Sequence, residues 1–181
     1  MNCPDCLSLT PVYLSIGANK GDKIANIGRA IKRLGEIEGI FIAALSKFYR
    51  TAPQDYTDQD WFVNAAVKIN TTYSPEQLLA VLQNIEKEQD RDGKAFRFGP
   101  RRIDLDIVFY GKRVVDTATL VIPHPRMHER LFVLKPLCDI DNNLVHPVNG
   151  LTVDELYEQI KTDDSQAVIA MAKEETREIF Y

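Results

Sequence analysis

Two aspartates, Asp104 and Asp106, lie two positions apart in a short stretch where charged and apolar residues alternate. In a β-strand successive side chains point to opposite faces, so both carboxylates would share one face, with Ile103, Leu105 and Ile107 on the other. Two neighbouring carboxylates repel each other unless a cation lies between them. Mg²⁺ is the natural cation, because it takes hard oxygen ligands and usually binds through one or two carboxylates plus substrate phosphates. Two such ions could hold both ends of a phosphoryl displacement.

Arginines gather just before this pair, in or beside the glycine-containing segment 90–100: they are Arg91, Arg97, Arg101 and Arg102. Arginine presents a planar fork of donors that matches phosphate oxygens. Taken separately, each feature has an ordinary explanation, because a D-x-D pair often lies on a solvated sheet face and arginines are typical of charged loops. Together they are the arrangement expected of metal–nucleotide chemistry.

The first part of the chain predicts strands and a helix that would position these groups. The β-branched stretch 12–16 indicates a strand, which ends in a tight loop at 17–19. Apolar residues then recur at helical spacing, with Gly35 where a C-terminal cap would stand. Segments 40–49 and 61–71 read as two further strands, with a loop between them. The apolar positions of the helix are Ile24, Ile27, Ile31 and Leu34.

Two later helices carry strong start signals. Ser74 can cap a helix in which Pro75 takes the first position and Gln77 closes a capping box. Thr152 opens a further helix in the same way, with Glu155 in the reciprocal position.

The remaining segments complete the predicted order. Segment 90–100 reads as a mobile loop, 103–110 as an alternating strand, 111–112 as a hairpin turn and 113–115 as the returning strand. A charged tail, 165–181, shows weak helical periodicity. The order strand, helix, strand, strand, helix, strand, strand, helix predicts the α+β class, with an antiparallel or mixed sheet covered by helices.

Length and composition restrict the class of protein. The chain has 181 residues, of which 45% are hydrophobic and 27% charged, which suits one domain with a core of its own. The net charge is −4, whereas a general nucleic-acid binder is more often basic. Phosphate recognition would therefore come from a local arginine cluster.

Cysteine usage and hydropathy indicate the compartment. There are three cysteines, and an odd count argues against a disulfide framework. Cys3 and Cys6 form a lone C-x-x-C pair without a second pair to complete a zinc site, so a frayed N-terminal tail is the simpler interpretation. No secretory signal and no apolar stretch long enough to span a bilayer are visible. We expect a cytoplasmic protein that binds neither nucleic acid nor membrane.

Five blocks together resemble one known family. They are LSIGAN at 14–19, SKFYRTAP at 46–53, FVNAAV at 62–67, RFGPRRIDLDI at 97–107 and IPHPRM at 122–127. In this order and spacing the chain resembles the 6-hydroxymethyl-7,8-dihydropterin pyrophosphokinases of folate biosynthesis. The resemblance implies a ferredoxin-like α/β sandwich that works as a monomer. It implies a domain at 12–162, with an N-terminal tail at 1–11 and a C-terminal extension at 163–181.

The resemblance also implies a reaction and a set of site residues. Family members move the β,γ-diphosphate of ATP onto the pterin hydroxymethyl group and release AMP, with two Mg²⁺ ions. Asp104 and Asp106 match the metal-binding carboxylates, and Arg91 and Arg97 would cover the triphosphate when their loop closes. No residue stands out as a general base, and either Asp106 or a metal-bound hydroxide could accept the proton. Matches to the pterin pocket are Thr51, Pro53, Gln54, Phe62, Asn64 and Phe132. Matches to nucleotide-contacting positions are Gln83, Glu86, Arg91, Arg97, Arg101, Ile107, His124 and Arg130.

Other interpretations compete with this one. Gly93 stands where many relatives have a further loop arginine. One alternative is therefore that the protein is an inactive relative that acts as a scaffold. A ferredoxin-like sheet with exposed aromatic residues could bind single-stranded RNA. A D-x-D metal enzyme could also act on another substrate, as a nucleotide hydrolase does. As isolated residues, Phe62 and Phe132 are typical of core packing and His124 of a loop.

Overall fold

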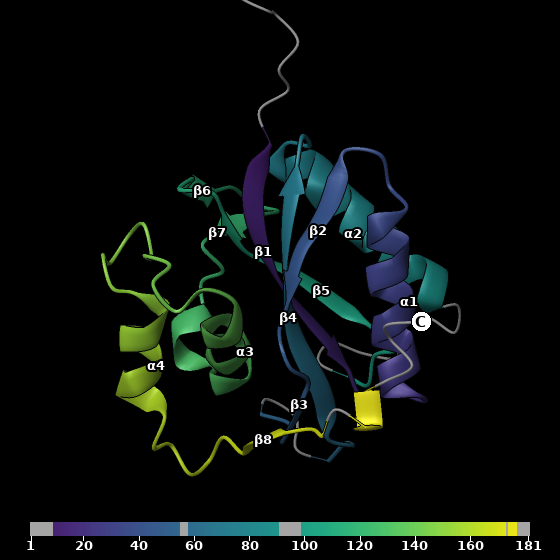
Figure 1. Cartoon of the computed structure of the whole chain (residues 1–181), viewed down its shortest axis with the longest axis vertical. Helices are drawn as coiled ribbons and strands as arrows, with labels where there is room; N and C mark the ends of the chain where they lie inside the picture. The colour runs from purple at the N-terminus through teal and green to yellow at the C-terminus, as the bar shows by residue number, and fades with distance from the viewer. Residues whose placement is uncertain (1–8, 55–57, 91–98, 173, 177–181) are drawn as a thin grey trace, which may run out of the picture.

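Two layers of helices enclose a central sheet in the computed structural model, which describes residues 9–54, 58–90, 99–172 and 174–176 (Figure 1). The first half of the chain forms β1 (Thr10–Ala18), α1 (Lys23–Gly35), β2 (Ile40–Leu45), β3 (Tyr49–Thr51), β4 (Phe62–Thr71) and α2 (Pro75–Gln89). The second half forms β5 (Asp104–Tyr110), β6 (Val115–Asp116), β7 (Val121–Ile122), the 3₁₀ turn η1 (Met127–Glu129), α3 (Leu131–Asp141), α4 (Val153–Ile160) and β8 (Val168–Ala170).

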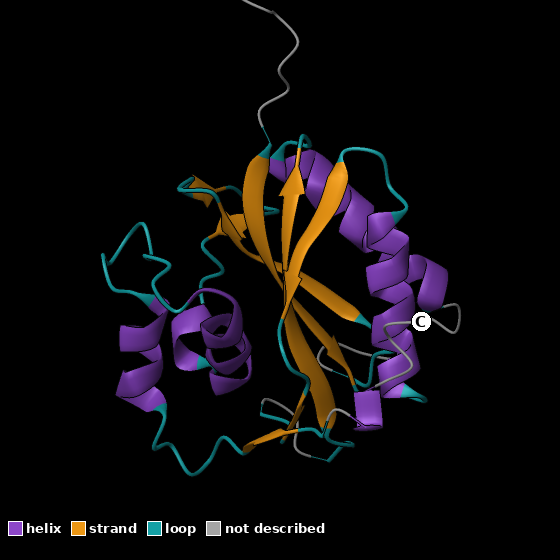
Figure 2. Cartoon of the chain, in the orientation of Figure 1, coloured by secondary structure: helices purple, strands orange, loops and turns teal. Residues whose placement is uncertain are grey.

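The main sheet of the described residues has six strands in the order β5-β1-β4-β3-β8, with β2 also paired to β4. All of its strand pairs are antiparallel. Helices α1 and α2 lie on one face of this sheet and α3 and α4 on the other (Figures 1 and 2). The prediction of an α+β protein with a mainly antiparallel sheet covered by helices is therefore confirmed.

Strand β1 lies between β5 and β4 and is buried on both faces. Val12, Leu14 and Ile16 point into the core beneath α1 and α2, where they meet Ile27 and Leu82. On the opposite face, a second core under α3 and α4 contains Tyr13, Phe109, Leu134 and Leu156. Because side chains alternate along a strand, the same strand contributes Ser15 and Gly17 to this second face, beyond Tyr13.

The helix starts follow their capping signals. Asp22 caps α1 by accepting a hydrogen bond from the Ala25 N–H at 3.0 Å. Both predicted capping boxes are present, at Ser74 for α2 and at Thr152 for α4. These ends depend only on residues within one helical turn, so a local pattern is sufficient to predict them.

Several predicted boundaries are corrected. The expected strand 12–16 continues through Gly17 and Ala18, because both pair with β4. Gly35 is the last residue of α1 rather than its cap, which is Glu36. The expected strand 40–49 is divided into β2 and β3, because Leu45 and Tyr49 oppose Val67 and Asn64 and so one residue is extra on their side.

Two further predictions are wrong for reasons of tertiary structure. Gly111 does turn the chain, with a positive φ of 52°, but the returning segment leaves the sheet, and β6 pairs with β7 rather than with β5. The tail predicted to be weakly helical contains β8, which pairs with β3.

Helix α3 is missing from the predicted order altogether. Its first residue follows Arg130, which makes no side-chain capping hydrogen bond, and Pro136 lies inside it. Both features remove the usual sequence signals for a helix.

Of the described helices, none has the length and apolar character needed to cross a bilayer. Cys3 and Cys6 lie outside the described residues, and Cys138 is a free thiol on α3. The domain boundaries proposed above remain a prediction.

Candidate active site

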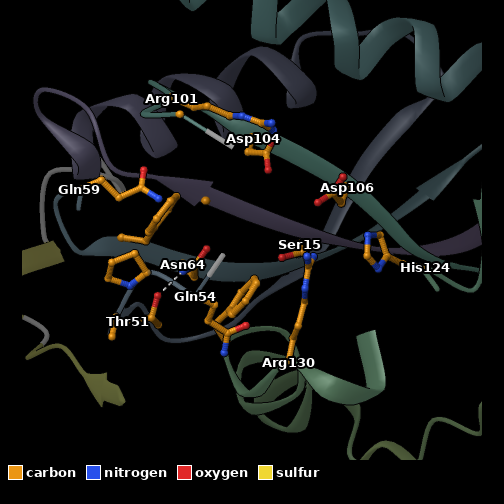
Figure 3. A pocket seen from close by; sticks show the side chains of 16 residues that line it. Ser15, Thr51, Gln54, Gln59, Asn64, Arg101, Asp104, Asp106, His124 and Arg130 are labelled. Atoms are coloured by element: carbon orange, nitrogen blue, oxygen red, sulfur yellow. Dashed lines mark hydrogen bonds and ion pairs between the residues drawn. The ribbon is translucent and has the colours of Figure 1, made fainter. Parts of the chain in front are cut away.

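A pocket of about 250 Å³ opens on the face of the sheet that α3 covers (Figure 3). Strands β1, β3, β4 and β5 provide its floor, and the start of α3 provides a wall through Arg130 and Phe132. All six residues predicted for the pterin line it: Thr51, Pro53, Gln54, Phe62, Asn64 and Phe132. Five residues predicted for metal or nucleotide also line it: Arg101, Asp104, Asp106, His124 and Arg130.

Strand register brings these residues together. Gly17 of β1 lies opposite Asp104 of β5 on one side and opposite Asn64 of β4 on the other. Ser15 in the same way lies beside Asp106. Antiparallel partners lie about 4.5–5.5 Å apart across a sheet, so the carboxylates and the polar floor form adjoining parts of one surface.

The polar floor centres on Asn64 and Thr51, which are buried. The Asn64 Nδ2 donates a hydrogen bond of 2.6 Å to the Thr51 Oγ1. The amide leans over β1 at Gly17, where an added Cβ would lie 2.5 Å from the Asn64 Oδ1. Glycine at position 17 therefore provides the space in which the Asn64 amide sits, with its Oδ1 directed over β1.

The two carboxylates carry an unfavourable charge arrangement in the absence of a cation. Burial raises the pKa of Asp106 to about 7, and the nearby carboxylates of Asp104 and Glu86 add to this effect. The Arg101 guanidinium forms an ion pair with the Asp104 Oδ1. A divalent cation between the two aspartates would relieve their repulsion, so the residues present fit the predicted metal.

The carboxylates do not make a closed metal site by themselves. Among residues 9–54, 58–90, 99–172 and 174–176, no group of three or more His, Cys, Asp and Glu side chains could hold an ion. A site of two carboxylates suits Mg²⁺, which commonly takes its other ligands from water and substrate phosphates.

Hydrogen-bond donors face the acidic pair. Burial lowers the pKa of His124 to about 4, assisted by the positive charge of Arg130, so the ring is neutral at pH 7. The His124 Nδ1 accepts a hydrogen bond of 3.2 Å from the Arg126 N–H, which leaves the Nε2 as the protonated nitrogen. His124 can therefore donate to an anion in the pocket without adding charge. The Arg130 guanidinium lies 5.4 Å from the centre of the Phe132 ring.

The segment that carries Arg101 is fastened to the end of β1. The Asn19 Oδ1 accepts a hydrogen bond of 2.8 Å from the Arg101 N–H. The Asn19 and Lys20 N–H groups both donate to the Arg101 carbonyl oxygen at 3.1 Å. The Asn19 Nδ2 also donates to the Gln59 Oε1 at 2.8 Å, and Gln59 lines the pocket.

Sequence reasoning did not identify Ser15, Gly17 or Gln59 as pocket residues, although the structure places them in its lining. The block 14–19 was the available signal for the first two. Gln59 carried no signal, because its place depends on a hydrogen bond to a residue forty positions earlier.

Three predicted nucleotide residues lie outside the pocket lining. Ile107 is buried in the core beneath α1 and α2, and Gln83 is exposed on α2. The Glu86 Oε1 accepts a hydrogen bond of 2.9 Å from the Leu105 N–H and so links α2 to β5. Arg91, Arg97 and Gly93 lie outside the described residues, so the expected cover over the triphosphate stays a prediction.

Comparison with known proteins identifies relatives that match most of the chain. The sequence model of the 7,8-dihydro-6-hydroxymethylpterin-pyrophosphokinase family matches residues 13–142. The chain is 44% identical over 147 residues to the 2-amino-4-hydroxy-6-hydroxymethyldihydropteridine pyrophosphokinase of Methylorubrum extorquens, which covers 81% of this chain and 91% of that protein. To the Bacillus subtilis protein of the same name it is 41% identical over 143 residues, with 79% and 85% covered.

Some relatives are much longer. The chain is 48% identical over 158 residues to the folic acid synthesis protein of Pneumocystis carinii, but spans only 21% of that protein's length. Among solved structures, a crystal structure of Plasmodium falciparum HPPK-DHPS matches with a TM-score of 0.69 at 15% identity, covering 90% of this chain and 49% of that one. At this identity the structural match shows the shared fold.

Proposed function

Because the chain belongs to the 7,8-dihydro-6-hydroxymethylpterin-pyrophosphokinase family, we propose that it transfers the pyrophosphoryl group of ATP to the hydroxymethyl oxygen of 6-hydroxymethyl-7,8-dihydropterin. The reaction releases AMP and belongs to folate biosynthesis. One observation carries the proposal: a single pocket joins a polar floor, bordered by Phe62 and Phe132, to the half-buried acidic pair Asp104 and Asp106.

The polar floor is the pterin end of the pocket. Asn64 offers a donor and an acceptor, which suits the mixed hydrogen-bonding edge of a pterin, and Thr51 holds its amide in place. Phe62 and Phe132 are half-buried and line the pocket, where a flat heteroaromatic ring gains from stacking against aromatic side chains. Pro53 and Gln54 complete this end.

The acidic pair is the phosphate end. Asp104 and Asp106 would hold two Mg²⁺ ions, which when bound neutralise triphosphate charge and polarise the transferred group. Arg101, Arg130 and His124 supply donors for phosphate oxygens from three different parts of the chain. Arg91 and Arg97 add two further guanidiniums from the segment between α2 and β5.

Catalysis in this proposal consists mainly of positioning and electrostatic stabilisation. The hydroxymethyl oxygen of the pterin attacks the β-phosphorus in line. A new phosphorus–oxygen bond forms, the bond from the β-phosphorus to the oxygen bridging to the α-phosphate breaks, and AMP leaves. Asp106 is the proposed acceptor for the hydroxyl proton. The buried floor at Asn64 and Thr51 holds the pterin so that its hydroxymethyl group points toward the aspartates.

The partners follow from the same reading. We propose ATP and the hydroxymethyl-pterin as the substrates of a monomeric, cytoplasmic enzyme that binds neither nucleic acid nor membrane. The net charge of −4 supports the expectation that the protein does not bind nucleic acid, and the odd number of cysteines supports a reducing compartment.

One assay tests the proposed activity against the alternatives. The protein is incubated with ATP, Mg²⁺ and 6-hydroxymethyl-7,8-dihydropterin, and the nucleotide product is identified. AMP that forms only when the pterin is present supports the proposal. ADP instead of AMP would indicate an ordinary kinase, AMP or ADP without pterin a nucleotide hydrolase, and no turnover an inactive scaffold or a binding module.

A further inference from the structure

Gln166 lies beyond the residues that match the family model, between α4 and β8. It is half-buried, and its side-chain amide uses every hydrogen-bonding position it has. The Oε1 accepts from the Leu131 N–H at 2.9 Å and also from the Gln54 Nε2. The Nε2 donates to the Glu129 carbonyl oxygen at 2.9 Å and to the Asp163 Oδ2 at 2.9 Å.

Two of these hydrogen bonds are made to the backbone on either side of Arg130. The Glu129 carbonyl precedes Arg130 and the Leu131 N–H follows it. Leu131 is the first residue of α3, and Arg130 supplies no side-chain cap for this helix. Gln166 therefore satisfies a helix-start N–H that would otherwise need another partner, and it does so from a distant part of the chain. Segment 129–132, which these bonds hold, carries two pocket residues, Arg130 and Phe132.

The other contact reaches a second part of the pocket lining, which precedes β4 in the chain. Gln54 lines the pocket and donates its Nε2 hydrogen to Gln166. The next residue of the tail continues the attachment, because the Ala52 N–H donates to the Ala167 carbonyl oxygen at 3.1 Å. One side chain of the tail thus joins the wall formed by Thr51–Gln54 to the wall formed by Arg130–Phe132.

We propose that Gln166 is a positioning residue for pterin binding: it sets the separation of the two pocket walls by bonding to both. This inference rests on the proposed function. Gln166 itself does not line the pocket, so it acts through Gln54 and Phe132. Phe132 belongs to one of these walls, and Thr51 of the other wall is the strand partner of Phe62. A change in the separation of the walls therefore alters the contact of a ring stacked between the two aromatic side chains.

The test replaces Gln166 with methionine, which keeps the length of the side chain and removes all four hydrogen bonds. Binding of 6-hydroxymethyl-7,8-dihydropterin is measured by calorimetry in the presence of Mg²⁺ and α,β-methylene-ATP, and steady-state kinetics are measured with ATP. The expected result is a rise of about tenfold in the Kd and KM for the pterin, with kcat within about threefold of wild type. Amide exchange at Leu131, followed by NMR, should become faster.

Glu175→Ala is the matched control. It removes the 2.7 Å ion pair with Arg50, which fastens the same tail to β3, but leaves the Gln166 contacts in place. Wild-type pterin affinity in this control, beside weakened affinity in Gln166→Met, supports the proposal. If Gln166→Met does not fold, Gln166→Asn, shorter by one methylene, makes the same comparison.

The outcomes separate this inference from the proposed function. Unchanged pterin affinity in a folded Gln166 variant overturns the inference alone, as does an equal loss in Glu175→Ala. A wild-type protein that binds no pterin overturns the proposed function and this inference with it.

Discussion

At the scale of one residue, Asp106 is a proposed metal ligand whose ionised form the fold disfavours. Its carboxyl group is buried beside Asp104, and its pKa rises from 3.8 to about 7 in consequence. The folded protein therefore disfavours the ionised form that a metal requires. Bound Mg²⁺ would reverse this preference, because a cation stabilises the charged carboxylate.

A raised pKa for an acid makes stability depend on pH in a fixed direction. The protonated Asp106 carboxyl contributes to the free energy of unfolding fully below about pH 4, and this contribution is lost as the pH rises through about 7. We expect the melting temperature, measured with EDTA between pH 4 and pH 8, to fall more steeply in wild type than in Asp106→Asn.

The same Asp106→Asn variant should lose at least about 100-fold in Mg²⁺-dependent turnover while remaining folded.

Asp116→Asn is the control for this experiment, since Asp116 is exposed on β6 and outside the pocket. It should keep both the turnover and the pH profile of wild type. An Asp106→Asn enzyme with wild-type turnover would refute the assignment of this residue to the metal.

Asn64 is the residue whose loss should separate the two substrates. Replacing it with alanine removes the bond to Thr51 and leaves the pterin edge without its amide partner. We expect pterin affinity to fall about 10- to 100-fold, with a smaller change for ATP, since an unsatisfied buried polar group costs about 1–3 kcal/mol. Calorimetry with each ligand measures the difference. Asn70→Ala, on the same strand but outside the pocket, should bind both ligands normally, and equal losses for both ligands in Asn64→Ala would contradict the pocket assignment.

At the scale of elements, the site depends on the space that Gly17 of β1 leaves for the Asn64 side chain of β4. An alanine there would place its Cβ 2.5 Å from the Asn64 Oδ1, which is closer than real contacts allow. The Asn64 side chain is the part that can move, so we expect Gly17→Ala to fold but to bind the pterin about tenfold more weakly. Calorimetry measures the affinity and thermal melting confirms the fold.

Gly35→Ala provides the matching control on α1. Its new Cβ would lie 3.8 Å from the Ile42 side chain, an ordinary contact, and helix residues gain up to about 1 kcal/mol from glycine-to-alanine replacement. This variant should be slightly more stable and bind the pterin as wild type does. Unaltered pterin binding in Gly17→Ala would show that the position of the Asn64 amide does not depend on the space above Gly17.

At the scale of the whole molecule, one sheet serves two cores. Strands β1 and β4 contribute alternate residues to the core under α1 and α2 and to the core under α3 and α4. The second core also fixes α3, whose start forms the pocket wall. Stability and site geometry are therefore linked through α3.

Leu134 of α3 is fully buried in the second core, so its truncation tests this link. We expect Leu134→Ala to lower the free energy of unfolding by about 2–5 kcal/mol in chemical denaturation. Ile169→Ala, at a side chain 55% exposed on β8, should change it by less than about 0.5 kcal/mol. A single unfolding transition should be retained, because both cores share the same strands. Two separate transitions in wild type would contradict this view of the molecule.

The sequence by itself determined the features that depend on near neighbours along the chain. Alternation in a strand places Asp104 and Asp106 on one face, and both line the pocket. The starts of α2 and α4 were predicted from capping boxes, whose partners lie three residues apart. The resemblance of five blocks to one family supplied the expected pterin residues, and all six of them line the same pocket.

Only the tertiary structure decided the features whose partners lie far apart in the chain. Helix α3 lacks a side-chain cap from Arg130, and the N–H of its first residue, Leu131, donates a hydrogen bond to the Oε1 of Gln166, thirty-five positions away. Strand β8 forms because β3 presents an open edge to the tail, and Ser15 and Gly17 enter the pocket through the register of β1 with β4 and β5. Hydrogen bonds between such distant groups leave no periodic trace in the sequence, because each depends on where folding brings its partner.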